Sequence, residues 1–178
     1  MKGKVSLYIA CSLDGYIAGQ DENLDFLSMV EAEGEDYGYH KFMQTVDAVI
    51  VGRKTYDWVV RQFEYPHTDK ECYVVSHRPG TPRTGLQFYD GDLGKLVDDL
   101  VGRGLHVYCE GGAQILKEIL LLDKIDVMVI SYIPIILGGG TPLFMEGVPE
   151  MKFRLTSCQS YPTGLVQLAY ERIRADNV

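Results

Sequence analysis

Several features that would assign a function at once are missing from this sequence. It has only four cysteines, Cys11, Cys72, Cys109 and Cys158, and no two of them form a C-x-x-C pair. This spacing argues against a zinc site, and the apolar surroundings of the cysteines predict buried free thiols in a reducing compartment. The net charge is −8, so the chain lacks the basic surface that non-specific nucleic-acid binding requires.

No apolar run is long enough to cross a membrane. The longest uncharged one, residues 127–137, is shorter than a transmembrane helix and contains Pro134. The apolar run near the start, residues 5–11, is followed at once by Asp14 and Gly15, which favours a first strand over a secretion signal. We therefore expect a soluble, cytoplasmic protein.

The composition is typical of a folded enzyme-sized domain. The chain has 178 residues, of which 46% are hydrophobic and 24% are charged. Such a chain can bury a substantial core and is too apolar to be disordered. No linker or internal repeat interrupts it, so we expect a single domain over residues 1–178.

Secondary-structure patterns alternate along most of the chain. Compact β-branched or aromatic runs predict strands at residues 5–10, 48–51, 72–76, 106–109, 127–133, 153–157 and 166–172. Helical patterns predict helices at residues 36–45, 55–62, 93–101 and 113–122. The early strands are apolar throughout, as are strands that are covered on both faces. This order predicts an α/β fold with a mostly parallel sheet, flanking helices and an antiparallel hairpin at the end.

One strand end resembles a binding site for a phosphate group. The apolar run at residues 48–51 stops at Gly52, and Arg53, Lys54 and Thr55 follow where the pattern becomes helical. In open α/β sheets, ligands bind beyond the carboxyl ends of the strands, where helix starts present unpaired N–H groups. Gly52 would let a phosphate approach the backbone, and the following side chains would add hydrogen bonds. The alternative is a solvated helix start with ordinary surface cations.

Two further strand ends carry groups that bind anions. One ends in a hydroxyl, an imidazole and a guanidinium, and the other ends in paired glycines at a helix start. These residues are Ser76, His77, Arg78, Gly111, Gly112, Ala113 and Gln114. One glycine-rich and two cationic strand ends suit the pyrophosphate and the extra 2′-phosphate of NADPH. The motifs G-x-G-x-x-G and G-x-x-x-x-G-K-[ST] are absent, so neither the usual Rossmann nor the P-loop arrangement is expected.

Four segments, taken in order, resemble the dihydrofolate reductase-like superfamily. They are SLDGYIA at residues 12–18, VGRKTY at 51–56, EGG at 110–112 and ILGGGTPLF at 136–144. The resemblance is strongest to a bacterial group related to the C-terminal reductase domain of the riboflavin-biosynthesis deaminase/reductase. It implies a three-layer α/β/α fold and hydride transfer from NADPH to a pyrimidine-like or pterin-like heterocycle. A homodimer is plausible by the same analogy.

The resemblance also implies roles for individual residues. Ala10 and Ile17 would border the nicotinamide, and the three strand ends described above would hold the phosphates and the adenosine end of NADPH. Ser131 matches a hydroxyl-bearing position that supports the substrate carboxylate in dihydrofolate reductases. Tyr37 and Tyr39 would either line an aromatic pocket or serve as plain packing.

Two carboxylates are candidates for handling the substrate. Asp36 resembles the substrate-binding carboxylate of dihydrofolate reductases, and we expect its side chain to be buried. The alternative is an ordinary acid at the start of a helix, where the helix dipole favours a negative charge. Glu35 is a neighbouring alternative and Asp25 a weaker one. Glu110 precedes the paired glycines and matches a glutamate of the riboflavin reductase domain. We therefore expect Asp36, Glu110 and Ser131 to be the catalytic residues.

One departure leaves the substrate open. Tyr8 stands where the riboflavin reductase domain carries a lysine, which affects recognition of a phosphoribosyl-amino-pyrimidine. The first expected acceptor is 5-amino-6-(5-phosphoribosylamino)uracil, and dihydrofolate is the second. A non-enzymatic NADPH-binding or sensing protein and an acidic structural domain without a ligand are the competing classes.

Overall fold

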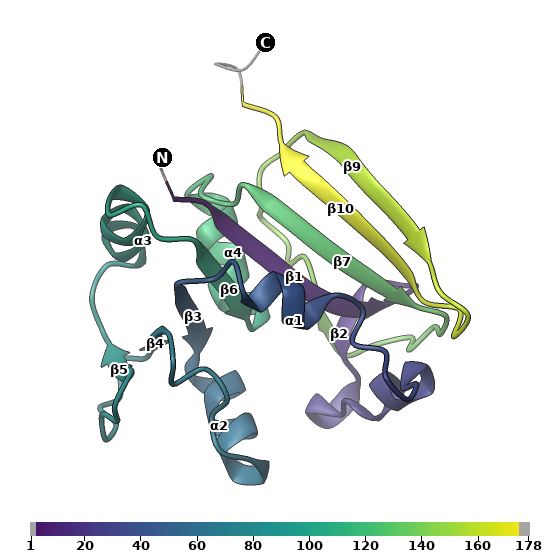
Figure 1. Ribbon diagram of the computed structural model, residues 1–178, viewed down its shortest axis with the longest axis horizontal. Helices are drawn as coiled ribbons and strands as arrows, with labels where there is room; N and C mark the ends of the chain where they lie inside the picture. The colour runs from purple at the N-terminus through teal and green to yellow at the C-terminus, as the bar shows by residue number, and fades with distance from the viewer. Residues whose placement is uncertain (1–2, 175–178) are drawn as a thin grey trace.

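The computed structural model describes residues 3–174 and shows one eight-stranded sheet with helices on both faces (Figure 1). Its strands are β1 (Val5–Ser12), β3 (Ala48–Gly52), β4 (Glu71–Val75), β5 (Leu86–Tyr89), β6 (Val107–Gly111), β7 (Val127–Ile133), β9 (Phe153–Ser160) and β10 (Val166–Arg172). Their order across the sheet is β5-β4-β3-β6-β1-β7-β10-β9. The six strands from β5 through β7 in this order run parallel to one another. Strand β10 runs antiparallel to β7, and β9 runs antiparallel to β10. The predicted α/β fold with a C-terminal hairpin is confirmed.

The remaining elements flank this sheet. They are β2 (Tyr16–Ala18), η1 (Gln20–Glu22), η2 (Asp25–Val30), α1 (Tyr39–Met43), α2 (Arg53–Gln62), α3 (Leu93–Gly102), α4 (Ala113–Leu121) and β8 (Thr141–Pro142). Helices α3 and α4 bury Leu100, Leu116 and Ile119 against one face of the sheet. Helices α1 and α2 cover the other face, where Val49 and Val51 of β3 lie. The sheet is therefore the middle of three layers.

The predicted helices and strands are present, with shifted ends and some omissions. Strand β5 and the small β2–β8 sheet were not predicted, and neither were the short helices η1 and η2. The first helix begins at Tyr39 rather than at residue 36. The helix begins three residues later than predicted because Tyr37 and Gly38 have φ angles of 57° and 84°, which are incompatible with a right-handed helix.

The cysteine prediction is partly wrong. Cys11, Cys72 and Cys109 are buried free thiols as expected, but Cys158 is exposed. Cys158 lies on β9, which is one of the two edge strands of the sheet and is exposed along most of its length, so its thiol meets solvent. Within residues 3–174, no helix has the length and apolar character needed to cross a membrane.

Candidate functional site

The carboxyl ends of β4, β3 and β6 lie side by side in the sheet. Gly52 pairs with Val75 on one side, and Val51 pairs with Gly111 on the other. A Cβ atom added at Gly52 would lie 3.0 Å from Cγ1 of Ile115 and 3.4 Å from both the carbonyl oxygen of Gly111 and the backbone nitrogen of Gly112. Glycine at position 52 therefore leaves room for the Ile115 side chain, and the structure brings the predicted glycine groups together.

Helices α2 and α4 begin at this edge, and among the described residues neither N-terminus is capped by a side chain. Their N-cap residues are Gly52 and Gly112. Helix α3, by contrast, has Asp92 as its N-cap, and its carboxylate accepts a 2.8 Å hydrogen bond from the Lys95 N–H. The Thr55 hydroxyl oxygen lies 3.1 Å from where a Cβ of Gly112 would be. Two adjacent uncapped helix starts with a hydroxyl between them suit a pyrophosphate.

Arg53 is held by several contacts. Its Nε donates to the Asp57 carboxylate at 2.8 Å, and its Nη1 donates at 3.4 Å to the carbonyl oxygens of Arg78 and Pro79. Its guanidinium carbon lies 5.1 Å from the centre of the Phe88 ring. Arg53 therefore joins α2 to the loop after β4, and Asp57 offsets part of its charge.

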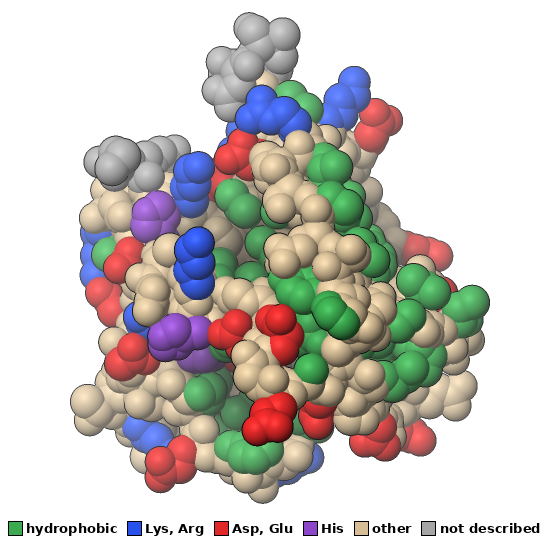
Figure 2. All heavy atoms as spheres, turned by 45° about the vertical axis from the view of Figure 1, so that its right-hand side comes forward, with side chains coloured by type: hydrophobic (Ala, Val, Ile, Leu, Met, Phe, Trp, Pro, Cys, Tyr) green, Lys and Arg blue, Asp and Glu red, His purple; other side chains and the backbone are tan. Residues whose placement is uncertain are grey.

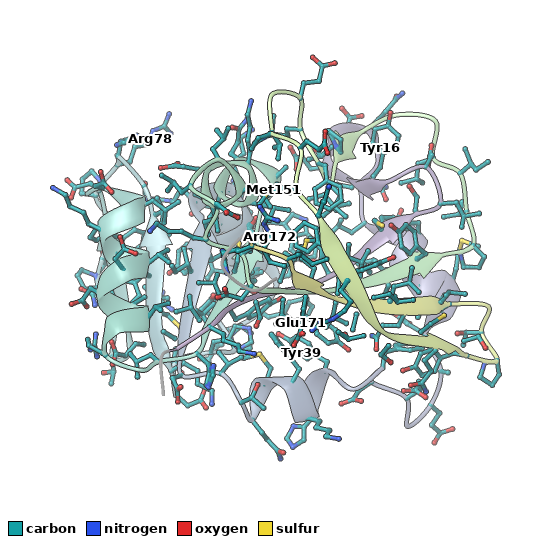
Figure 3. All side chains as sticks on the ribbon, turned by 90° about the horizontal axis from the view of Figure 1, so that it is seen from above. Tyr16, Tyr39, Arg78, Met151, Glu171 and Arg172 are labelled. Atoms are coloured by element: carbon teal, nitrogen blue, oxygen red, sulfur yellow. The ribbon has the colours of Figure 1, made fainter. Side chains whose placement is uncertain are left out.

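The loop after β4 carries the second cationic group. The Ser76 hydroxyl is buried, donates to the Arg78 carbonyl at 2.9 Å and accepts from the Arg78 N–H at 3.0 Å. His77 and Arg78 are exposed, as are Lys54 and Gln114. Figure 3 shows Arg78 at the margin of the molecule, well separated from Tyr39. The candidate cofactor edge therefore extends outward to Arg78, whereas Ser76 shapes the loop.

A cavity of about 490 Å³ opens on the α1 face of the sheet. Four tyrosines from three elements and a loop form much of its wall, and Ala10 and Ser131 contribute from β1 and β7. The tyrosines are Tyr8, Tyr37, Tyr39 and Tyr108. Ala10, which the resemblance places beside the nicotinamide, is part of this lining, whereas Ile17, Glu110 and the residues of the three predicted strand ends are not.

Gln167 organises one wall of the cavity. Its Nε2 lies 2.9 Å from the Tyr8 hydroxyl, 3.1 Å from the Tyr37 carbonyl oxygen and 3.1 Å from the Ser131 hydroxyl. The Tyr8 hydroxyl in turn donates to the Tyr37 carbonyl. Ser131 thus bonds to an amide rather than to the carboxylate that the resemblance implied. Sequence reasoning missed Gln167, because nothing in the β10 pattern marks it.

Asp36 is placed at the cavity rim and is exposed, so the expectation of a buried carboxylate is wrong. Its two oxygens accept hydrogen bonds from the backbone N–H groups of Gly38 and His40, at 2.8 and 2.9 Å. Both hydrogen bonds lower the pKa of Asp36, and the bond from His40 has the larger effect. Asp36 therefore stays ionised at neutral pH and caps the start of α1. Its neighbour Glu35 also lines the rim, whereas Asp25 does not.

Glu110 is nearly buried, with 13% of its side chain exposed, and is enclosed by two groups from the loop before β4. The Tyr65 hydroxyl donates to its carboxylate, and Nε2 of His67 lies 3.5 Å away. The Tyr39 hydroxyl lies 3.3 Å from the same His67 nitrogen, and Tyr39 lines the cavity. Burial, with the charge of Glu110 as the second cause, raises the pKa of both Tyr39 and Tyr65. His67 and Tyr65 carried no motif that could have identified them.

This arrangement of strands, with a mostly parallel central sheet, flanking helices and antiparallel strands at the end, is that of dihydrofolate reductase-like α/β proteins. The sequence model described as the RibD C-terminal domain matches residues 3–167, and the chain therefore belongs to that family.

Individual relatives agree with this assignment. The chain is 38% identical over 175 residues to the Bacillus subtilis (strain 168) protein YwjB, covering 97% of this chain and 99% of that one. A putative riboflavin biosynthesis protein from Shewanella sp. PV-4 has a TM-score of 0.87 and 32% identity, covering 98% of this chain and all (100%) of that one.

A more distant solved structure shares the fold. The Thermotoga maritima diaminohydroxyphosphoribosylaminopyrimidine deaminase/5-amino-6-(5-phosphoribosylamino)uracil reductase has a TM-score of 0.71 and 19% identity. The match covers 97% of this chain but only 57% of that larger protein.

Proposed function

We propose that this protein is an NADPH-dependent reductase that transfers hydride to a nitrogen heterocycle. Membership in the RibD C-terminal domain family supports a reductase. The observation that carries the proposal is the pair of adjacent helix starts at Gly52 and Gly112, neither of which is capped by a side chain of the described residues. The tyrosine-lined cavity shares strand β6 with the second helix start, because Tyr108 of β6 lines the cavity. A dinucleotide could place its phosphates on the helix starts and its reactive ring toward the cavity.

The cofactor-binding residues divide into two groups in this proposal. Backbone N–H groups that follow Gly52 and Gly112, with the Thr55 hydroxyl, would hold the pyrophosphate. His77 and Arg78 would face the 2′-phosphate, with Arg53 fixing the loop that carries them. The other proposed contacts are Ala10, Ile17, Lys54, Ser76, Gly111, Ala113 and Gln114. When bound, NADPH would supply the hydride.

The chain's own contribution to proton handling would come from the cavity wall and its rim. Asp36 lies at the rim, and the Tyr39 hydroxyl and a Glu110 carboxylate oxygen both approach the same nitrogen, Nε2 of His67, which would hold the Tyr39 hydroxyl in place at the cavity wall. In this proposal Glu110 acts as a positioning residue that orients His67 and, through it, Tyr39, because its carboxylate does not reach the cavity lining. Ser131, fixed by Gln167, would orient the substrate.

The acceptor is proposed from the relatives. The T. maritima protein is named as a 5-amino-6-(5-phosphoribosylamino)uracil reductase, so this pyrimidine is the first acceptor to test and dihydrofolate is the second. A homodimer is also proposed, since β9 is an edge strand whose outer side has no partner strand within the described chain. Light scattering on the purified protein would decide the oligomeric state.

Calorimetric titration with NADPH and NADH, followed by an assay of NADPH oxidation with each acceptor, tests the proposal. We expect NADPH to bind more tightly than NADH and to be oxidised only when a heterocycle is present. Tight NADPH binding without oxidation of any acceptor would favour the non-enzymatic alternative. No binding of either cofactor would remove the proposal.

A further inference from the structure

The cavity lining has an unusual balance of charge. Three carboxylates, Glu31, Glu35 and Asp36, stand at its rim, and among the described residues its lining includes no lysine, arginine or histidine. Figure 2 shows acidic side chains gathered in the lower middle of the molecular face, while most lysines and arginines in this view lie toward its left and upper edges. Arg78 of the proposed cofactor edge lies far from Tyr39 of the cavity wall (Figure 3).

The polar groups deeper in the cavity do not compensate for this charge. The Tyr8 hydroxyl donates to the Tyr37 carbonyl and accepts from Gln167, so its bonds are made within the protein. The Ser131 hydroxyl also contacts Gln167, at 3.1 Å. These groups are neutral and mutually bonded, and an anion entering the cavity would find no charged partner to replace its hydration.

The rest of the wall suits a flat and largely apolar ring. Leu27, Val30, Ile133 and Leu165 line it together with the four tyrosines. Aromatic and aliphatic side chains bind a planar heterocycle by burying its apolar surface, and a few polar groups then fix the orientation of the ring. Carboxylates at the rim are acceptors only, so they favour ligands that present amino or ring N–H donors.

We propose that this cavity takes an amino-substituted nitrogen heterocycle without a phosphate group, either uncharged or protonated, so that an unphosphorylated acceptor replaces the phosphoribosylated pyrimidine as the favoured substrate. The inference rests on the proposed function, since it assumes that the ring in this cavity is the hydride acceptor. A phosphate dianion near three carboxylates would be repelled by all of them. Because the three carboxylates are exposed and screened by solvent, the expected discrimination is modest, on the order of tenfold in affinity.

Neighbouring glutamates provide a matched pair of variants. Glu31 lines the cavity, and its side chain makes no hydrogen bond to any residue from 3 to 174, whereas Glu33 is exposed on the same loop but is not part of the lining. Glu31→Lys and Glu33→Lys therefore change the net charge by the same amount, one at the cavity and one outside it. The probes are a ribosylamino-pyrimidine and its 5′-phosphate monoester, titrated calorimetrically into protein saturated with NADPH and into protein without it.

We expect the unphosphorylated compound to bind the wild-type protein about tenfold more tightly than its phosphate ester. Glu31→Lys should remove most of this preference, and Glu33→Lys should retain it. Equal or tighter binding of the ester to the wild type would overturn the inference, as would equal effects of the two variants or no binding of either compound. The NADPH titration is read separately, so its failure would count against the reductase proposal and not against the charge preference.

Discussion

Glu110 and His67 form a nearly buried pair in which Oε1 of the glutamate lies 3.5 Å from Nε2 of the histidine. Their side chains are only 13% and 7% exposed, and they come from β6 and from the loop before β4. Tyr65 and Tyr39 complete the cluster, through bonds to Glu110 and to His67 respectively. The cluster connects the strand that ends at the glycine pair with the wall of the cavity.

Replacing Glu110 should therefore affect stability as well as turnover. Glu110→Ala would leave the buried Tyr65 hydroxyl without its acceptor, and we expect a loss of about 2–4 kcal/mol in the free energy of unfolding, measured by urea denaturation. Glu110→Gln keeps an acceptor and should lose about 1 kcal/mol. Glu118→Ala, at an exposed position of α4, is the control. Equal losses for Glu110→Ala and Glu118→Ala would show that the cluster contributes nothing to stability.

Buried thiols predict how stability depends on alkaline pH. Burial, the largest cause in each case, raises the pKa of Cys11 to about 11 and those of Cys72 and Cys109 to about 12. In the unfolded chain these thiols ionise near pH 9, so above that pH the unfolded state loses protons that the native state keeps. The free energy of unfolding then falls by about 1.4 kcal/mol per thiol for each further pH unit, until the folded pKa is reached.

The measurement is a set of urea denaturation curves between about pH 8 and pH 11. We expect the free energy of unfolding to be flat at the lower end and to fall progressively above about pH 9. The raised pKa values of Tyr39 and Tyr65 act in the same direction above about pH 10. A constant free energy of unfolding over this range would show that the thiols are open to solvent.

Arg78 and Arg53 should differ in their effects on the cofactors. Arg78 is exposed in the loop after β4, so Arg78→Ala should weaken NADPH binding about tenfold more than NADH binding, as measured by calorimetry. Arg53 holds that loop and bonds to Asp57, so Arg53→Ala should weaken both cofactors. Arg61→Ala, at the exposed far end of α2, is the control. Equal losses of NADPH and NADH in Arg78→Ala would refute the 2′-phosphate assignment.

The fold was predictable because its central strands are covered on both faces. Every residue of β3 is buried, and a continuous apolar run that ends in glycine is the pattern such a strand produces. Strand β5 has only four residues, in which Gln87 is exposed, and it follows a loop rich in glycine and proline, so no comparable run marked it. Short edge strands depend on pairing with their neighbour more than on their own composition.

The candidate site was predictable only where a local pattern defines it. Glycines at helix starts follow directly from strand–helix boundaries, and the structure places Gly52 beside Gly112. Gln167, by contrast, lies 159 residues from Tyr8 and 36 residues from Ser131 along the chain, yet it bonds to both. Such contacts arise from the antiparallel return of β10 beside β7, and no local spacing encodes them. His67 was missed for the same reason.

Asp36 provides the sharpest test of where the substrate is handled. Asp36→Asn removes a rim charge but keeps one carbonyl oxygen that can accept from the backbone at the start of α1, so the fold should be retained. If this carboxylate assists proton transfer, turnover should fall about 100-fold while NADPH affinity stays nearly unchanged. Steady-state kinetics with calorimetry would measure both, and Glu33→Gln on the same loop is the control. Unchanged turnover would exclude Asp36 and would leave the Tyr39 hydroxyl, which His67 holds at the cavity wall, as the next group to test.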